Sequence, residues 1–192
     1  LALATFPFGL MARQYLVTAI VRWFALQPPD RDVVAVREGL TETAMVTRAA
    51  RWGTPYSYLL LTNSISMAPW NQRSSRYMRE FVYLPVALHP EARRALLISY
   101  GVGVTAKALT DTTSLQSIDV VDVSRDVVKA TRVVYPGPGE HPLDDPRVKL
   151  HIEDGRFFLA SRSETFHTIT GEPPPPVAAG ISALYSKEYF HL

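Results

Sequence analysis

The sequence contains no cysteine among its 192 residues. A disulfide framework, a thiolate nucleophile and a zinc–thiolate centre are therefore excluded. A strong charge of either sign is also missing, because 20 basic residues face 18 acidic ones and the net charge is only +2. The 16 arginines and 4 lysines are scattered along the chain, so no basic stripe indicates a nucleic-acid partner.

Several short catalytic and binding motifs are absent as well. The chain has neither a Gly-x-Ser-x-Gly elbow nor a Gly-x-x-x-x-Gly-Lys phosphate loop, so it indicates neither of those two chemistries. Its five histidines have no spacing typical of metal ligands, and we expect no metal site.

Residues 1–30 are mostly apolar, but no uninterrupted run reaches the ~18 apolar residues that a membrane-spanning helix needs. A complete span is therefore not encoded in this stretch. Two interpretations stay open. The segment is either the end of a membrane span with Arg13 at its cytoplasmic flank, or an amphipathic helix packed on the domain. The first attaches the protein to the cytoplasmic side of a membrane, and the second makes it cytoplasmic.

Strand-forming residues dominate the next stretch, residues 31–66. Three runs rich in β-branched, aromatic and apolar residues predict a small antiparallel sheet: Val33–Val36, Thr43–Thr47 and Tyr56–Thr62. Residues Met67–Ser75 are expected to form a loop. A helix is predicted from Tyr77 to Leu88, because apolar side chains recur there at helical spacing and His89-Pro90 ends the pattern.

Residues 67–192 alternate between strand and helix patterns. Four strands are predicted: Ala95–Ser99, Ser117–Asp122, Val148–Glu153 and Phe166–Glu172. The helices between and after them are Thr105–Leu109, Arg125–Val134, Gly155–Ser161 and one that starts near Ser182. This alternation predicts an α/β fold, a parallel sheet with helices on both faces. In such a sheet, ligands bind beyond the carboxyl ends of the strands.

A glycine-rich loop follows the first of these strands. Gly101, Gly103 and Ala106 form a Gly-x-Gly-x-x-Ala pattern, which allows a sharp turn, close approach of a ligand and tight packing of the next helix. Asp122 follows Gly101 by 21 residues, at the end of the neighbouring strand, where its carboxylate can accept hydrogen bonds from both hydroxyls of a ribose. The pattern favours a nucleoside site over a tight turn that binds nothing.

Three further polar positions fall at the same edge of the predicted sheet. Ser124 is a candidate N-cap of the second helix. Asp154, before Gly155, either accepts a hydrogen bond from the exocyclic amine of an adenine or caps the third helix. Glu172 ends the fourth strand and precedes four consecutive prolines, an extended and rigid segment that we interpret as one wall of a cleft.

Several segments, in this order and spacing, resemble the spermidine/spermine synthase family, the polyamine aminopropyltransferases. The resemblance covers about residues 63–192 and rests on Tyr77–Pro85 with His89-Pro90, Leu97–Gly103, Val121–Ser124, Asp144–Val148, Asp154–Arg156 and Leu184–Tyr189. It implies a small N-terminal β domain followed by a Rossmann-like domain of the methyltransferase type, which stops before the last strands of the family's sheet. Residues 1–30 suit those members whose synthase-like domain is appended to a membrane-spanning region.

The resemblance also implies roles for single residues. Glu172 takes the place of the family's catalytic aspartate, and Tyr77 and Tyr185 are the implied amine-substrate residues. The implied nucleoside residues are Gly101, Gly103, Asp122, Ser124, Asp154 and Gly155. The sequence departs from the family at two acids, because Val102 replaces the loop acid and Pro175 replaces a second aspartate.

The implied reaction transfers an aminopropyl group from decarboxylated S-adenosylmethionine to a polyamine or another small amine, without a metal. Glu172 would hold the cationic amine and accept its proton. A homo-oligomer is compatible with this activity. Two alternatives stay open: a methyltransferase that uses S-adenosylmethionine on the same scaffold, and a nucleoside-binding module without catalysis.

Overall fold

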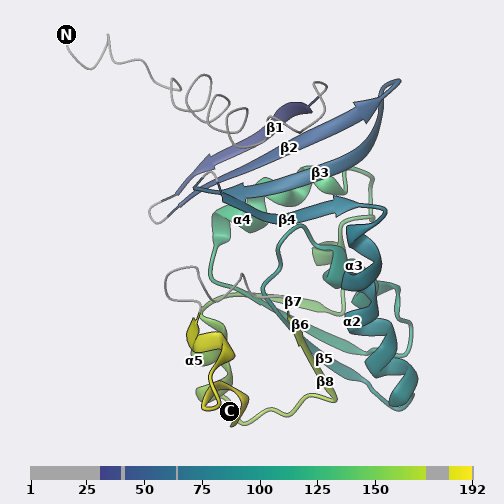
Figure 1. Ribbon diagram of the computed structural model, residues 1–192. Coiled ribbons are helices and arrows are strands. Elements are labelled where there is room, and N and C mark those ends of the chain that lie inside the picture. Colours follow the sequence, from purple (N-terminus) through teal and green to yellow (C-terminus); the bar gives the residue numbers. More distant parts are fainter. Residues whose placement is uncertain (1–30, 40–41, 64, 172–181, 192) are drawn as a thin grey trace, which may run out of the picture.

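The computed structural model describes residues 31–39, 42–63, 65–171 and 182–191. These residues form two four-stranded sheets with helices around them, and the N-terminal sheet is stacked against the end of the second sheet (Figure 1). The apolar segment 1–30, Glu172 and the four prolines that follow it lie outside the described residues. Within the described ranges, no helix is both long enough and apolar enough to cross a membrane.

The N-terminal sheet is antiparallel and has four strands in chain order: β1 (Arg31–Glu38), β2 (Thr43–Arg51), β3 (Thr54–Thr62) and β4 (Ile65–Asn71). The predicted small β sheet is present, but the expected loop Met67–Ser75 is wrong, because β4 runs past residue 66 to Asn71. Pro69 lies within this strand, although proline is rare in strands because it cannot donate a backbone hydrogen bond. It is tolerated because β4 is an edge strand, where one side of the backbone needs no hydrogen-bond partner.

The second sheet contains the four predicted strands, all parallel, in the order β7-β6-β5-β8. Their bounds are β5 (Arg94–Ile98), β6 (Ser117–Asp122), β7 (Val148–Ile152) and β8 (Thr168–Gly171). Along β5, Ala95 and Leu97 point to one face, and Leu96 and Ile98 point to the other. All four are buried, as expected for a parallel strand covered on both sides.

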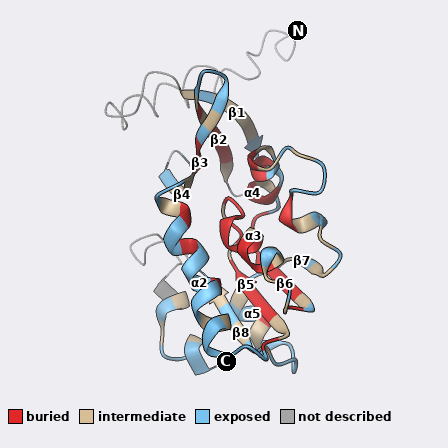
Figure 2. Cartoon of the chain, turned by 90° about the vertical axis from the view of Figure 1, so that its right-hand side faces the viewer, coloured by how far each residue is buried: buried red, intermediate tan, exposed pale blue. Residues whose placement is uncertain are grey.

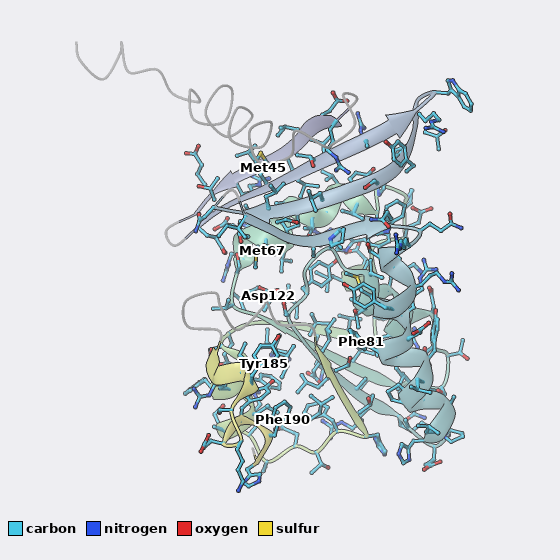
Figure 3. The ribbon with its side chains drawn as sticks, viewed as in Figure 1. Met45, Met67, Phe81, Asp122, Tyr185 and Phe190 are labelled. Carbon is cyan, nitrogen blue, oxygen red and sulfur yellow. The ribbon has the colours of Figure 1, made fainter. Side chains whose placement is uncertain are left out.

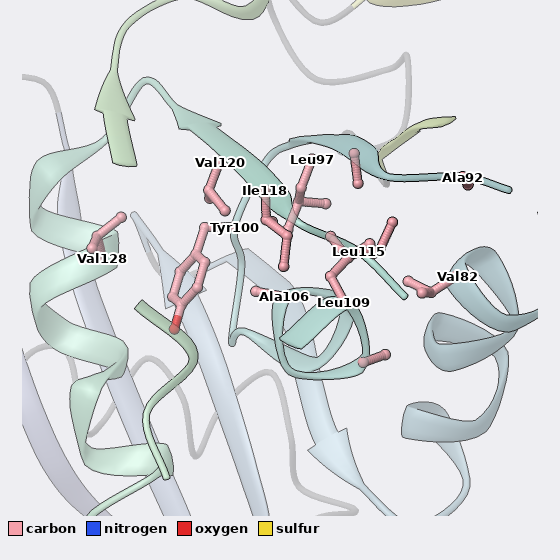
Figure 4. Packing of buried hydrophobic residues seen from close by; sticks show 12 residues of the cluster. Val82, Ala92, Leu97, Tyr100, Ala106, Leu109, Leu115, Ile118, Val120 and Val128 are labelled. Atoms are coloured by element: carbon pink, nitrogen blue, oxygen red, sulfur yellow. The ribbon is translucent and has the colours of Figure 1, made fainter. Parts of the chain in front are cut away.

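Helices cover both faces of this sheet, as the alternating pattern predicted. On the side of Leu97 lie α2 (Ser74–Leu88) and α3 (Val104–Asp111), and Figure 4 shows the cluster that they bury with β5 and β6. On the side of Leu96 lies α5 (Gly155–Ala160), which contributes Phe158. The described ranges also contain 3₁₀ helices: η2 (Thr131–Val134), η3 (Pro142–Asp144), η4 (Ser182–Tyr185) and η5 (Tyr189–His191).

Helix α4 (Arg125–Ala130) joins the two sheets and continues into η2, so the predicted helix 125–134 changes type at residue 131. Val127 on α4 is buried in one cluster with Val46 on β2 and Leu60 on β3. Met45 lies in a separate cluster on the opposite face of the N-terminal sheet, because successive side chains of a strand alternate between faces. The predicted final helix near Ser182 is present only as the short η4.

Helix α2 buries a different side from the one that its apolar spacing suggests. Its buried residues are Ser75, Met78 and Val82. The apolar residues that predicted the helix remain between 39% and 69% exposed: Tyr77, Phe81, Leu84 and Leu88. Figure 2 shows this outer side of α2 in the colour of exposed residues. The helix prediction is confirmed, but the apolar stripe that carried it faces away from the sheet.

Candidate functional site

A cavity of about 580 Å³ lies between the N-terminal sheet and the carboxyl ends of β5, β6 and β7. This is where an open parallel sheet is expected to bind its ligand. Met67 on β4, Asp122 on β6 and Tyr185 on η4 line it from three directions (Figure 3). The cavity is therefore built from both sheets and from segments more than a hundred residues apart in the sequence.

The loop between β5 and α3 forms one wall of the cavity, and its two glycines have different structural roles. Gly101, with a φ of +56°, lines the cavity. Gly103, with a φ of +81°, precedes α3 and is not one of the lining residues. A Cβ placed on Gly103 would lie 2.6 Å from the hydroxyl oxygen of Tyr100. The left-handed backbone and the missing side chain at Gly103 thus make room for the Tyr100 ring.

Tyr100 and His141 form a buried pair beneath this loop. The Tyr100 hydroxyl lies 3.3 Å from Nε2 of His141, and Nδ1 of His141 accepts a hydrogen bond from the backbone N–H of Leu143 at 3.3 Å. In the neutral ring Nε2 then carries the proton and donates to Tyr100. Burial raises the pKa of Tyr100 and lowers the pKa of His141, and the Arg132 guanidinium lowers the latter further. No sequence motif predicts this pair, because the two residues are 41 positions apart.

Asp122 lies at the end of β6, lines the cavity and is only 7% exposed. Its Oδ2 accepts the backbone N–H of Tyr100 at 2.7 Å, and its Oδ1 accepts the N–H of Ser124 at 2.8 Å. The carboxylate therefore ties the glycine loop to the end of the neighbouring strand. Burial raises its pKa, and these two N–H groups partly offset the rise. A carboxylate has about four acceptor sites, so Asp122 can still accept a hydrogen bond from a ligand hydroxyl.

Ser124 and Asp154 begin the next two helices. The Ser124 hydroxyl oxygen accepts the N–H of Val127 at 3.0 Å, so the predicted N-cap of α4 is present. Asp154 caps α5, because its Oδ1 accepts the N–H groups of Arg156 and Phe157 at 3.0 and 2.9 Å. Both caps also line the cavity. The structure therefore shows Asp154 as a helix cap, one of its two predicted roles, in a position that also lines the cavity.

Gly155 and Val102 shape two parts of the cavity wall. A Cβ on Gly155 would lie 2.7 Å from Cγ2 of Ile98, so only glycine lets α5 start this close to β5. Val102, which the sequence resemblance matches to the family's loop acid, lines the cavity and is 2% exposed. It packs in a cluster with Met78 of α2 and residues of the N-terminal sheet. The wall between the glycine loop and α2 is therefore apolar.

The charged side chains that line the cavity are all acidic: Glu42, Asp122, Glu153 and Asp154. No Lys, Arg or His belongs to the described lining residues. Glu42, which immediately precedes β2, was not predicted from the sequence as a site residue. Its negative charge raises the pKa of Asp122. No group of three or more acidic or histidine side chains able to hold a metal ion occurs in the described ranges.

The structure brings most, but not all, of the predicted site residues together. Six line the cavity: Gly101, Asp122, Ser124, Asp154, Gly155 and Tyr185. Tyr77 is on the outer part of α2, with its ring against Phe81 at a centroid distance of 5.8 Å, and it is not among the lining residues. Glu172, the predicted catalytic acid, lies outside the described residues, directly after the end of β8.

The two sheets and the cavity define a Rossmann-like domain of the methyltransferase type preceded by a small β sheet. A family model for the spermine/spermidine synthase domain matches residues 74–192. The chain therefore belongs to the spermine/spermidine synthase family, which confirms the resemblance and the fold class predicted from the sequence.

Sequence similarity to named proteins supports this family assignment. Polyamine aminopropyltransferase 1 of Pseudomonas aeruginosa is 29% identical over 114 residues, which are 59% of this chain and 40% of that protein. The polyamine aminopropyltransferase of Clostridium perfringens is 32% identical over 114 residues, with the same two coverages. The chain thus spans about two fifths of the length of these relatives.

Solved structures show the same fold at lower identity. A spermidine synthase in complex with the transition state analogue AdoDATO aligns with a TM-score of 0.69 and 20% identity over 82% of this chain and 52% of that one. The spermidine synthase from Thermotoga maritima aligns with a TM-score of 0.66 and 19% identity over 82% and 51%. The chain covers about half the length of each.

Proposed function

We propose that the protein transfers an aminopropyl group from decarboxylated S-adenosylmethionine to a small amine. The observation that carries this proposal is the charge of the cavity. Its lining combines four carboxylates with no cationic side chain among the described residues. The decarboxylated donor carries a sulfonium and an amine that is protonated at neutral pH, so the cavity and the donor have opposite charge.

The same observation argues against ordinary S-adenosylmethionine as the donor. That molecule keeps an α-carboxylate, which needs a cation or a cluster of hydrogen-bond donors to replace its water. The Val102 side chain offers neither, and Glu42, Glu153 and Asp154 would repel the carboxylate. The methyltransferase alternative is therefore the less favoured one.

The reaction forms one bond and breaks another. The neutral nitrogen of the acceptor attacks the methylene carbon next to the sulfonium, the C–N bond forms, the C–S bond breaks, and methylthioadenosine leaves with the electron pair. The nitrogen must lose a proton, and a carboxylate close to it can accept that proton. Glu172 remains the predicted acceptor on sequence grounds, because it follows Gly171, which pairs with Ile98 immediately before the glycine loop.

Product identification tests this function. The full chain is incubated with either donor and a panel of di- and polyamines, and the products are analysed by mass spectrometry. Methylthioadenosine and an aminopropylated amine are expected. S-adenosylhomocysteine would instead establish a methyltransferase, and binding without turnover would establish a nucleoside-binding module. Glu172→Gln should keep donor affinity and lower turnover by ~100-fold or more if it accepts the proton.

A further inference from the structure

The four carboxylates that line the cavity differ in whether they already have a hydrogen-bond or ion-pair partner in the protein. Asp122 accepts two backbone N–H groups, and Asp154 accepts two N–H groups of α5. Glu153 forms an ion pair with Arg162, whose Nη2 lies 3.2 Å from Oε2. Glu42 is the exception, since no hydrogen bond or ion pair joins its carboxylate to any residue in the described ranges.

Hydrogen bonds of the main chain position Glu42 beside the cavity. The N–H of Gly39 donates to the carbonyl of Glu42 at 2.8 Å. The next residue, Thr43, exchanges two hydrogen bonds with Asn63: its N–H donates to Oδ1 at 2.9 Å, and its carbonyl accepts the Asn63 N–H at 3.0 Å. Glu42 is half-buried and lines the cavity from the N-terminal sheet. Glu42 is thus positioned at the cavity, and its carboxylate has no hydrogen-bond or ion-pair partner among the residues that the structure describes.

We propose that Glu42 makes the cavity select the cationic donor over the neutral nucleoside product. This inference rests on the proposed function, because only aminopropyl transfer converts a dication into the uncharged methylthioadenosine. An unpaired carboxylate in a partly buried site attracts a cation more strongly than one whose charge an arginine or backbone N–H groups already balance. It gains nothing from a neutral ligand of the same shape.

The charge difference gives the enzyme a way to release its product. Donor and product share the adenine, the ribose and the sulfur, so contacts with those groups bind both equally well. They differ in the aminopropyl chain and in the charges of the sulfonium and the ammonium. The attraction between Glu42 and the sulfonium disappears when the C–S bond breaks, and the ammonium leaves with the transferred aminopropyl group. Glu42 therefore lowers the affinity for the product relative to the donor without any movement of the protein.

Glu42→Gln tests the proposal, because it removes the charge and keeps the shape. The matched control is Glu38→Gln, on the same hairpin, where Glu38 is exposed at the end of β1 and does not line the cavity. Affinities of the full chain for decarboxylated S-adenosylmethionine and for methylthioadenosine are measured by calorimetry, without an amine acceptor. We expect Glu42→Gln to weaken donor binding about tenfold and methylthioadenosine binding less than ~2-fold. Glu38→Gln should leave both as in the parent chain.

Salt provides a second measurement. Raising the ionic strength to about 0.5 M should weaken donor binding in the parent chain more than in Glu42→Gln, since screening acts on the same charge pair. Methylthioadenosine binding reports that the variant is folded. An unchanged ratio of the two affinities, or an equal loss of both, would overturn the role of Glu42. Failure of the proposed function is a separate result, namely a parent chain that binds neither nucleoside or produces no methylthioadenosine.

Discussion

The glycine at position 103 offers a sharp test of how the glycine loop is built. Gly103→Ala adds a Cβ that would lie 2.6 Å from the Tyr100 hydroxyl oxygen, 2.9 Å from its Cζ and 3.2 Å from Cε2 of Tyr135. Gly101→Ala is the matched control. Gly101 also has a positive φ, but its added Cβ would meet only Cβ of Ala68, at an ordinary 3.4 Å.

The expected loss of stability follows from these contacts. Both variants hold an alanine in the left-handed region, which costs about 1–2 kcal/mol. Gly103→Ala must also displace the buried Tyr100 ring, which adds about 1–3 kcal/mol of overpacking and weakens a hydrogen bond worth about 1 kcal/mol. We therefore expect a loss of about 3–6 kcal/mol for Gly103→Ala and about 1–2 kcal/mol for Gly101→Ala.

Urea unfolding followed by tryptophan fluorescence measures both free energies in one assay. Repeating Gly103→Ala in a Tyr100→Leu background should recover most of the extra loss, because the smaller side chain leaves room for the new methyl group. Equal losses for the two glycine variants would refute the steric reasoning. An extra loss that persists without the Tyr100 ring would place its cause elsewhere in the loop.

Two further predictions concern the groups that touch this loop. Asp122→Ala should weaken methylthioadenosine binding, measured by calorimetry. It should also lower the free energy of unfolding, measured in urea, by about 1.5–3 kcal/mol for each N–H left without a charged acceptor. An unchanged free energy of unfolding would contradict the role of Asp122 as a bridge between the glycine loop and β6. His141 is held neutral by burial, so its folded pKa lies below the ordinary 6.5. Below about pH 6.5 the unfolded chain therefore binds more protons at His141 than the folded protein does. The contribution of His141 to stability is present above pH 6.5 and is lost as the pH falls below that value. Unfolding curves of the parent chain and of His141→Asn across this window should differ in slope, and parallel curves would count against the pKa shift.

Local patterns predicted the part of the fold that depends on one segment and its immediate neighbours. The continuous apolar run of β5, the two glycines and the acid that ends β6 were enough to place a cavity at the strand ends. The N-caps Ser124 and Asp154 were readable for the same reason, since a cap depends on the next three residues only.

Features that depend on distant segments were not predictable in this way. β4 carries a proline, and only its place at the sheet edge explains why it is a strand. The apolar stripe of α2 indicated a helix but not which side faces the sheet. Glu42 reaches the cavity because the N-terminal sheet stacks over strand ends that lie far along the chain, and no short motif encodes that packing.

The placement of the cavity between two separate sheets has a consequence for how the molecule moves. A ligand that contacts Met67 on β4 and Asp122 on β6 acts as a bridge, because separating the two sheets would break its contacts on one side. At a concentration of 100 times its Kd, such a ligand opposes that opening by about 2.7 kcal/mol. Amide protons exposed when the layers part should then exchange with solvent about a hundred times more slowly, in both sheets together. The empty protein and the loaded protein would thus differ less in shape than in how often the two layers come apart.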